Sequence, residues 1–329
     1  MVWPRIFDRY TELDPTHPPL TMKAVFRWGI VDPLTGRRRV APPGPGAPRV
    51  EPDLDRVYGR DGAPRLTWIG HASFLGSLDG ARFLIDPVLS RRLSGFFPRH
   101  VPPGLEPHQL PPVDAVMVTH SHYDHMDGAT LGRLPRGTPV FVPRGLGRWF
   151  RRRGFTAVSE LSWWESAENG RLRVTLTPAR HWSRRGLWDT NSTLWGGFVV
   201  EAGGAAVYHA GDTAWFPSAF REIRRRFPDL LAAMLPIGAY RPAWFMEYNH
   251  MNPEQAGRAF LEVGARHLIP MHWGSFQLTD EPLCEPAERI RAWWRANGGD
   301  GGDGDGRGDK KLHLLAVGET VTLRGGDGR

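Results

Sequence analysis

The sequence has a single cysteine and no long hydrophobic run. Its 329 residues include only Cys284, which excludes an internal disulfide and a cysteine-rich zinc ribbon and is typical of a reducing compartment. No segment approaches the roughly 20 consecutive apolar residues that cross a bilayer. Proline and aspartate stand near the N-terminus, where a signal peptide needs its apolar run. We therefore expect a cytoplasmic protein that can touch a membrane at its periphery but does not span one.

Lysine is almost absent, and arginine takes its place. Only Lys23, Lys310 and Lys311 are lysines among 42 basic residues, which outnumber the 35 acidic ones and give a formal net charge of +7. A guanidinium group suits phosphate and carboxylate. The charge therefore fits an anionic small substrate, an anionic lipid surface or nucleic acid, and selects none of them. A genome composition that favours arginine over lysine is an equally open explanation.

The chain divides by composition near residue 63. Residues 1–63 are rich in proline and arginine, as at 37–46, and this composition cannot form a regular helix or a central strand. We predict an extended N-terminal arm, anchored by the cluster at 26–28. A strand-and-turn pattern begins at residue 64, and we assign 64–325 to one domain. Residues 298–309 are almost entirely glycine and aspartate, which predicts a flexible loop there.

Short strands dominate the first part of this domain and alternate with helices in the second. Strands are predicted at 65–69, 81–85, 113–119, 139–142, 172–177, 197–201, 205–209, 266–269 and 311–317, with the first two forming a hairpin. Helices are predicted at 220–227, 253–263 and 285–296. The 40% share of hydrophobic residues allows a sizeable core. We predict an α/β fold in which helices cover sheets within one domain.

Four metal-capable side chains follow the strand at 113–119 within six residues. They are His120, His122, Asp124 and His125. The two histidines at 120 and 122 project from the same side of an extended backbone, whereas Asp124 and His125 follow where the chain turns. One short loop can thus serve two adjacent cations. Imidazole and carboxylate ligands suit zinc, with iron or manganese as alternatives. A cluster of surface polar residues does not explain three histidines and an aspartate directly after an apolar strand.

Three further strands each end in one metal-capable side chain. His181 follows the strand at 172–177, Asp212 follows that at 205–209, and His272 follows that at 266–269. Strand ends converge at one edge of a sheet, so these loops can meet there. Alone, His181 or His272 is as easily a core or surface histidine. Together with the first cluster they give seven candidate ligands, which suits two metal ions that share a bridging carboxylate.

The pattern His-x-His-x-Asp-His, followed by separate His, Asp and His residues, resembles the metallo-β-lactamase superfamily. The resemblance implies a four-layer αβ/βα sandwich with two zinc ions at one edge of the β-sandwich. In that family one zinc would be held by His120, His122 and His181. The other would be held by Asp124, His125 and His272, and Asp212 would bridge the two.

Longer strings are similar to one subfamily, the N-acylphosphatidylethanolamine-hydrolysing phospholipases D. They include Thr67-Trp68-Ile69-Gly70-His71-Ala72 and His272-Trp273-Gly274-Ser275-Phe276, with further strings at 110–116, 181–185, 189–191, 194–196 and 237–246 and at His250. The similarity covers approximately residues 64–320. It implies a phospholipid or other anionic phosphodiester substrate. It also implies that a zinc-bound hydroxide attacks phosphorus and releases an N-acylethanolamine and a phosphatidic acid.

Asp124 and His250 are the candidate catalytic residues. Asp124 can orient or deprotonate the water as well as bind metal. His250 lies outside the ligand set and can protonate the leaving alcohol or bind phosphate, and a structural role in capping the following helix is an equally open explanation. By resemblance, His71 and Asp86 lie beside the site, where they support ligands or pack. Aromatic residues near the ligand loops can line an acyl groove or rest at a bilayer interface, although core packing explains most of them.

Two other functions stay open. The first is another hydrolase on the same scaffold, a lactonase or a nuclease. The arginine runs at 151–153 and 224–226 fit fragments of a nucleic-acid surface, solvated helix faces or lipid-headgroup contacts, and we find no dedicated nucleic-acid module. The second is a non-catalytic lipid- or metal-binding protein, against which the full ligand set counts. The sequence predicts no oligomeric state.

Overall fold

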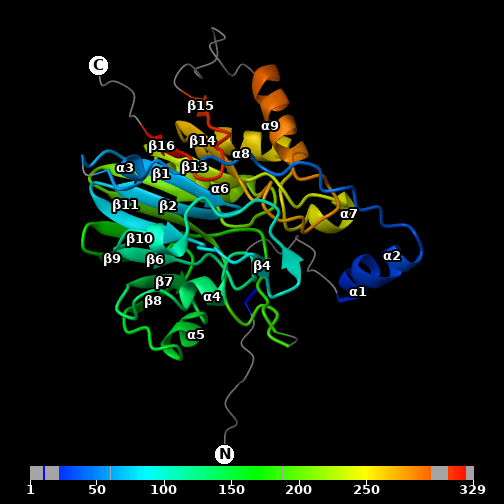
Figure 1. Ribbon diagram of the computed structural model, residues 1–329, viewed down its shortest axis with the longest axis horizontal. Helices are drawn as coiled ribbons and strands as arrows, with labels where there is room; N and C mark the ends of the chain where they lie inside the picture. The colour runs from blue at the N-terminus through cyan, green and yellow to red at the C-terminus, as the bar shows by residue number, and fades with distance from the viewer. Residues whose placement is uncertain (1–9, 12–21, 60, 187, 298–309, 324–329) are drawn as a thin grey trace, which may run out of the picture.

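The computed structural model describes residues 10–11, 22–59, 61–186, 188–297 and 310–323. The flexible loop predicted at 298–309 lies outside the described residues. Two seven-stranded sheets form the centre of the molecule (Figure 1). No helix among the described residues is long and apolar enough to cross a bilayer.

The first sheet is antiparallel at one end and parallel at the other. Its strands, in spatial order, are β16 (Thr320–Thr322), β1 (Arg65–Gly70), β2 (Ser73–Leu78), β3 (Ala81–Ile85), β6 (Ala115–Met117), β7 (Val140–Pro143) and β8 (Val158–Leu161). The ladders from β16 to β3 are antiparallel, and those from β3 to β8 are parallel. The parallel half brings the end of β6, and the metal-capable loop after it, to one edge of the sheet.

The second sheet repeats this arrangement. Its strands, in spatial order, are β15 (Lys311–Leu312), β14 (His267–Met271), β13 (Leu230–Pro236), β12 (Ala205–His209), β11 (Gly197–Ala202), β10 (Leu172–Thr177) and β9 (Ser166–Asn169). The ladders from β9 to β12 are antiparallel, and those from β12 to β15 are parallel. A separate hairpin joins β4 (Arg92–Leu93) to β5 (Phe97–Pro98).

Helices cover the outer faces of both sheets. On β3, Phe83 and Ile85 face the core between the sheets, whereas Leu84 faces outward, as the period of two in a strand requires. The outward side chains of the first sheet pack with α4 (Gly128–Leu131) and α5 (Gly147–Arg151). Helices α6 (Pro217–Arg226), α8 (Pro253–Val263) and α9 (Glu285–Ala296) cover the second sheet (Figure 1). The predicted four-layer αβ/βα sandwich is therefore confirmed.

The strand predictions are wrong in several places. The strands at 65–69 and 81–85 do not pair with each other, because β2 lies between them and pairs with both. Every residue of β2 is buried, so its sequence shows no polar alternation; β13, also almost entirely buried, was missed for the same reason. The strand predicted at 311–317 ends at Leu312, and the chain then crosses to the first sheet to form β16.

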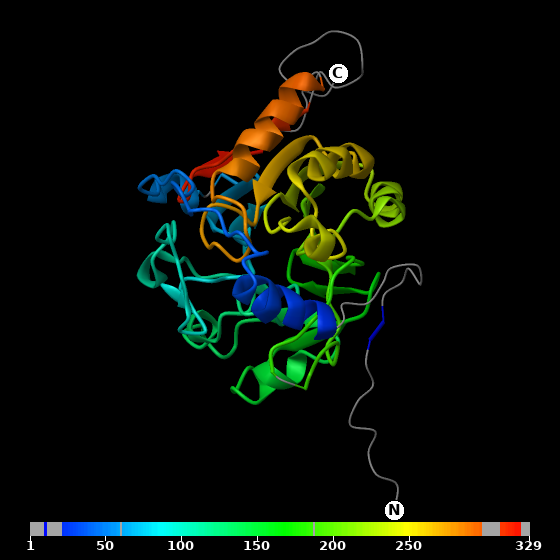
Figure 2. The ribbon, with the colours of Figure 1, turned by 90° about the vertical axis from the view of Figure 1, so that its right-hand side faces the viewer.

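The prediction that residues 1–63 contain no regular helix is also wrong. A helical segment is built from α1 (Met22–Phe26), a π-helical turn (Arg27–Val31) and α2 (Asp32–Leu34), followed by α3 (Leu54–Val57). The segment 22–34 contains one proline, Pro33, which lies in the first turn of α2, where it breaks no hydrogen bond. Figure 2 shows α1 and α2 lying across this side of the molecule.

The segment at 26–28 does anchor the arm, as predicted. The ring of Trp28 stacks on Phe245 of α7 (Ala243–Met246) with centroids 5.0 Å apart, and the Arg27 guanidinium lies 4.2 Å from the Trp244 ring. Farther along, Ala47 N–H donates to Gly274 O at 3.0 Å. The arm thus contacts both α7 and the loop after β14.

Candidate metal centre

The structure brings all seven predicted ligand residues together. The loop from β6 to α4 carries His120, His122, Asp124 and His125. Separate loops after β10, β12 and β14 carry His181, Asp212 and His272 respectively. Their ligand atoms fall into overlapping groups in which all atoms lie within 4.8 Å of one another. Two of these groups form the two halves of the centre.

The first half, which we call the histidine trio, consists of His120, His122 and His181. Nδ1 of His122 lies 2.8 Å from Nε2 of His120 and 3.2 Å from Nε2 of His181. The opposite nitrogens are fixed from behind. Nδ1–H of His120 donates to the Thr119 hydroxyl at 3.0 Å, and Nδ1–H of His181 donates to Asn249 O at 3.0 Å. These bonds leave the Nε2 lone pairs of both rings directed toward the centre of the trio.

The trio is electrically neutral at neutral pH. Burial lowers the pKa of all three rings, to about 4 for His122 and well below the ordinary value for His120 and His181. Neighbouring histidines lower the pKa of His120 and His181 further, because protonated rings would repel one another. Three unprotonated imidazoles are the state in which histidine binds a metal ion.

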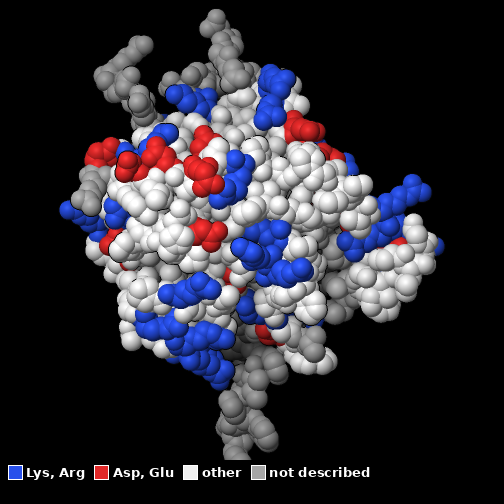
Figure 3. All heavy atoms as spheres, in the orientation of Figure 1, with Lys and Arg blue, Asp and Glu red and all other residues white. Residues whose placement is uncertain are grey.

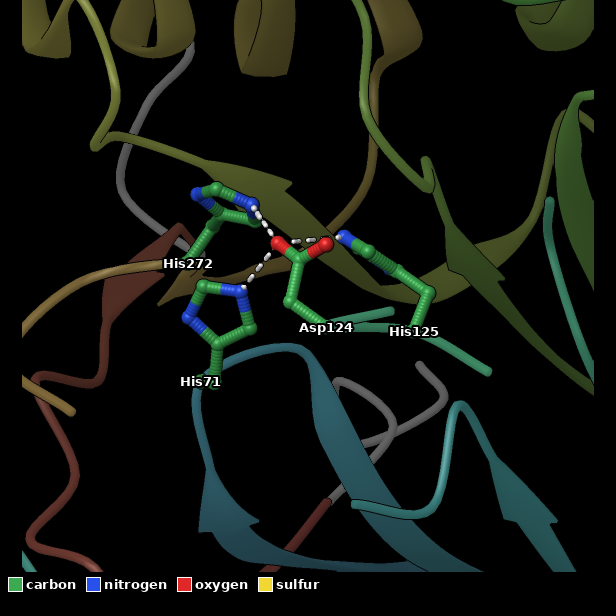
Figure 4. Close-up of side chains that lie close together, drawn as sticks. All are labelled: His71, Asp124, His125 and His272. Carbon is green, nitrogen blue, oxygen red and sulfur yellow. Dashed lines mark hydrogen bonds and ion pairs between the residues drawn. The ribbon is translucent and has the colours of Figure 1, made fainter. Parts of the chain in front are cut away.

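The second half, the aspartate cluster, consists of His71, Asp124, His125 and His272 (Figure 4). Oδ2 of Asp124 lies 2.9 Å from Nε2 of His71, 3.3 Å from Nε2 of His272 and 3.6 Å from Nε2 of His125. The four side chains come from the turn after β1, the β6–α4 loop and the loop after β14, and the three histidines point toward the Asp124 carboxylate (Figure 4).

The aspartate cluster carries charges, whereas the trio is neutral. Burial alone would lower the pKa of His272, but Asp212 and Asp124 raise it to about 9. The pKa of His125 also lies well above the ordinary value, because the negative charges of Asp212, Asp124 and Asp86 raise it more than burial lowers it. Burial would raise the pKa of Asp124, yet the neighbouring histidines, His125 first, hold it well below its usual range. Protons here occupy the positions that a cation would take.

Asp86 supports both halves from behind. It accepts Nδ1–H of His125 at 2.7 Å, the Thr119 hydroxyl at 2.6 Å and the Thr119 N–H at 2.7 Å. Nε2 of His125 is therefore directed into the centre. Because the same Thr119 hydroxyl accepts from His120, one buried carboxylate orients a histidine in each half. Asp86 thus occupies the supporting position that the resemblance implies.

Asp212 lies between the two halves. Its Oδ2 is 3.1 Å from Nε2 of His272 and 3.2 Å from Nε2 of His125, and 3.8 and 3.9 Å from Nε2 of His181 and His120. Its Oδ1 is buried and, among the described residues, has no hydrogen-bond partner, whereas Nε2 of His125 and of His272 lie within ion-pair distance of carboxylates but complete no hydrogen bond. Buried polar atoms without partners are costly. Cations at these positions would satisfy them, so the donor set fits metal ions.

His250 also faces this centre. Its Nδ1 lies 4.0 Å from Oδ2 of Asp212, and its ring lies 5.1 Å from the ring of His181. Helix α8 is capped by Asn252, whose side chain accepts from Gln255 N–H at 2.9 Å. The explanation of His250 as the cap of that helix is therefore wrong, because Asn252 already fills this role.

Comparisons with known proteins agree with this geometry. The family model of the β-lactamase superfamily domain matches residues 81–273, more than half of the chain. The chain belongs to the metallo-β-lactamase superfamily. Within this superfamily it is 37% identical over 242 residues to the N-acyl-phosphatidylethanolamine-hydrolyzing phospholipase D 1 of Caenorhabditis elegans, and the match covers 68% of each chain.

One further relative and one solved structure are similar to this chain. A metal-dependent hydrolase of Rubrobacter xylanophilus is 35% identical over 65% of this chain and 84% of its own length. The crystal structure of a possible metal-dependent hydrolase from Veillonella parvula shares the fold with a TM-score of 0.63 at 23% identity, over 79% of this chain and all of that one. The chain is a metal-dependent hydrolase with the metallo-β-lactamase fold.

One buried residue of this metallo-β-lactamase site was missed in the sequence. His209 is fully buried between the sheets, where its Nε2–H donates to Ala72 O at 2.9 Å and its Nδ1 accepts from Gly211 N–H at 3.1 Å. It therefore ties the turn next to His71 to the loop next to Asp212. The local signal was only the histidine at the end of a predicted strand.

The aromatic residues near the ligand loops divide as expected. Phe150 is fully buried and belongs to the core under α5. Trp182 contacts the His122 ring with centroids 4.6 Å apart. Tyr123, between two ligands, is 43% exposed, and Trp188 is 80% exposed. Phe150 thus belongs to the core, whereas Trp182 and Tyr123 lie beside the centre.

Proposed function

We propose that this chain is a dinuclear zinc phosphodiesterase that cleaves N-acylated ethanolamine phospholipids into N-acylethanolamine and phosphatidic acid. The observation that supports it best is the convergence of seven ligand side chains, five of them buried and His122 and Asp124 partly buried, on two adjacent points, with Asp212 between them. The identity to a phospholipase D of this type supports the choice of substrate. Iron and manganese are the alternative metals, since the same ligands accept them.

The ligand roles follow from the two halves of the centre. The histidine trio would hold one ion, and Asp124, His125 and His272 would hold the other, with Asp212 in contact with both. Ions bound there would acidify a water molecule and stabilise negative charge on phosphate oxygens. His71 donates Nε2–H to Asp124 at 2.9 Å, because the carboxylate oxygen can only accept. Burial lowers the pKa of His71 to about 3 and keeps its ring neutral. His71 thereby fixes the orientation of the carboxylate.

Asp124 and His250 are the groups that would handle protons and the substrate phosphate. Asp124 keeps its negative charge, so its oxygen can orient a water molecule and accept its proton. Nδ1 of His250 is buried and has no hydrogen-bond partner among the described residues. We assign His250 to the phosphate or to the leaving oxygen, which would supply the missing partner.

A phospholipid substrate implies contact with a bilayer surface. The helical segment of the N-terminal arm at 22–34, which we call the arm helix, exposes Phe26, Ile30 and Leu34 at fractions of 55%, 47% and 83%. These residues are four apart and therefore lie on one face of the helix. An exposed apolar face of this kind suits peripheral contact with lipid rather than a membrane-spanning position.

The test is a substrate screen of purified, metal-analysed protein. It compares N-acylphosphatidylethanolamine, ordinary phospholipids, lactones and RNA, with Asp212→Asn as the matched inactive control. We expect about two zinc ions per chain and preferential release of N-acylethanolamine, both lost in the control. Metal-loaded protein that opens lactones or cuts RNA but leaves every phospholipid intact would contradict the proposal and favour one of the other hydrolases.

A further inference from the structure

The two arginine runs in the sequence have different surroundings. On α6, Glu222 accepts from Arg225 at 2.7 Å and from Arg226 at 2.7 Å, and Arg221 lies 3.4 Å from Glu262. Glu222 thus pairs with two of the three arginines of this run, and Glu262 on α8 pairs with the neighbouring Arg221. It is a solvated helix face held by ion pairs.

The other run belongs to a larger group of exposed arginines at the end of the molecule that carries α4 and α5. We call this group the α5 arginine patch; it consists of Arg133, Arg136, Arg144, Arg148, Arg151, Arg152 and Arg153. In Figure 3 basic side chains gather over this end of the molecule. Glu160 pairs with Arg151, and Glu165 lies 3.6 Å from Arg144. Within the described ranges the other five arginines have no ion pair, so the patch keeps a strong positive charge.

The patch continues to the metal-binding loop through stacked side chains. The Arg153 guanidinium lies 3.7 Å from the Trp149 ring, and the Arg185 guanidinium lies 4.3 Å from the Tyr123 ring and 5.8 Å from that of Trp149. Arg185 also donates to Met126 O at 2.7 Å, within the β6–α4 loop. Tyr123 stands between His122 and Asp124. A surface that binds the patch thus lies close to the metal centre.

We propose that the α5 arginine patch docks the protein on an anionic lipid bilayer. Guanidinium groups pair well with lipid phosphates, and partly exposed tryptophan and tyrosine rings beside them suit the headgroup region. Unpaired basic residues are drawn to the negative surface potential of such a bilayer, and salt screens this attraction. The choice of lipid over RNA rests on the proposed function, since the same bilayer would supply the substrate.

The test measures sedimentation of the full chain with vesicles. One set of vesicles is phosphatidylcholine alone, and the other is an equimolar mixture with phosphatidylglycerol. The patch variant is Arg148→Glu/Arg152→Glu, which reverses two exposed, unpaired charges four residues apart. The matched control is Arg291→Glu/Arg295→Glu on α9, in the opposite outer layer, with the same spacing, exposure and charge change.

We expect the unmodified chain and the α9 control to bind the anionic vesicles, with binding that weakens as salt is raised. The patch variant should bind them about tenfold more weakly or worse, with an unchanged melting temperature and unchanged turnover of a short-chain, monomeric substrate. Equal loss in both variants would overturn the proposal, because net charge alone would then explain binding. Patch-dependent binding to single-stranded RNA without vesicle binding would overturn it in favour of a nucleic-acid surface.

The outcome separates this inference from the proposed reaction. Patch-dependent vesicle binding by a protein that cleaves no phospholipid would support the docking surface and refute the substrate. Cleavage of monomeric phospholipid by a protein that ignores anionic vesicles would support the reaction and refute the docking surface.

Discussion

The histidine trio and the aspartate cluster are a few ångströms apart but use opposite electrostatics. In the trio, burial lowers the pKa of three imidazoles, and a cation meets unprotonated nitrogens. In the cluster, carboxylates raise the pKa of His125 and His272, and a cation must displace protons. The difference arises because Asp212 and Asp124 lie beside His125 and His272, and the β6–α4 loop contributes two histidines to the trio and Asp124 with His125 to the cluster. Asp212 is the side chain that both halves share.

The largest effect is expected from removing that shared side chain. Asp212→Ala should impair metal binding in both halves, because Oδ2 of Asp212 lies within 3.9 Å of a histidine nitrogen in each half. We expect metal content to fall from about two ions per chain to traces and kcat/KM to fall by about a thousandfold or more. Elemental analysis and phosphodiester assays measure this. Asp229→Ala, an exposed carboxylate change far from the centre, serves as the control. Retention of both ions in Asp212→Ala would show that the carboxylate does not bridge.

A substitution confined to one half should remove one metal ion and leave the other bound. His122→Ala removes the nitrogen on which the trio converges and should leave about one ion, held by the aspartate cluster. Asp124→Asn keeps the shape of the side chain but removes its charge and should leave about one ion in the trio. Metal titration of each variant, followed by the double variant, measures the two occupancies. Loss of both ions in each single variant would mean that the halves bind metal only together.

His250 tests whether the trio side of the centre also contacts substrate. His250→Ala should leave metal content and melting temperature nearly unchanged and lower kcat/KM by about a hundredfold, the usual scale for a positioned proton or hydrogen-bond donor. The loss should shrink for a nitrophenyl phosphodiester if the histidine protonates the leaving oxygen. His250→Gln, which keeps an N–H donor, should recover part of the loss if the histidine binds phosphate. A fully metallated His250→Ala with normal turnover on both substrates would remove it from the site.

Most ligands of the metal centre could be predicted from the sequence, because each of them follows the end of a strand. Whether a strand ends in a histidine or an aspartate is local information, so the sequence alone identifies His120, Asp212 and His272. The sequence does not predict that the ligands divide into a neutral and a charged half, because that depends on which rings the fold brings near Asp124 and Asp212. The role of His209 likewise depends on contacts between two sheets.

The sequence prediction missed two strands whose burial hides the pattern and one whose pairing is remote. β2 and β13 lack polar alternation because neither face meets water. β16 is too short to show a strand pattern in the sequence, and its partner β1 lies some 250 positions earlier, as the Thr67–Thr320 pairing shows. The arm helix was missed because proline density elsewhere in 1–63 outweighed its own helical segment.

The smallest expected effect is on the stability of the metal-free protein, where the two halves should act at opposite ends of the pH scale. Folding lowers the pKa of His122 to about 4, so protonation between about pH 6.5 and 4 favours the unfolded chain, and stability falls as acid is added. Folding raises the pKa of His272 to about 9, so its stabilisation is complete below about pH 6.5 and is lost as the pH rises through about 9. The melting temperature of chelator-treated protein should therefore pass through a maximum between these limits. His122→Gln should flatten only the acid side of the curve and His272→Gln only the alkaline side. If both variants flatten the same side, the two halves share one electrostatic environment and the contrast between them is refuted.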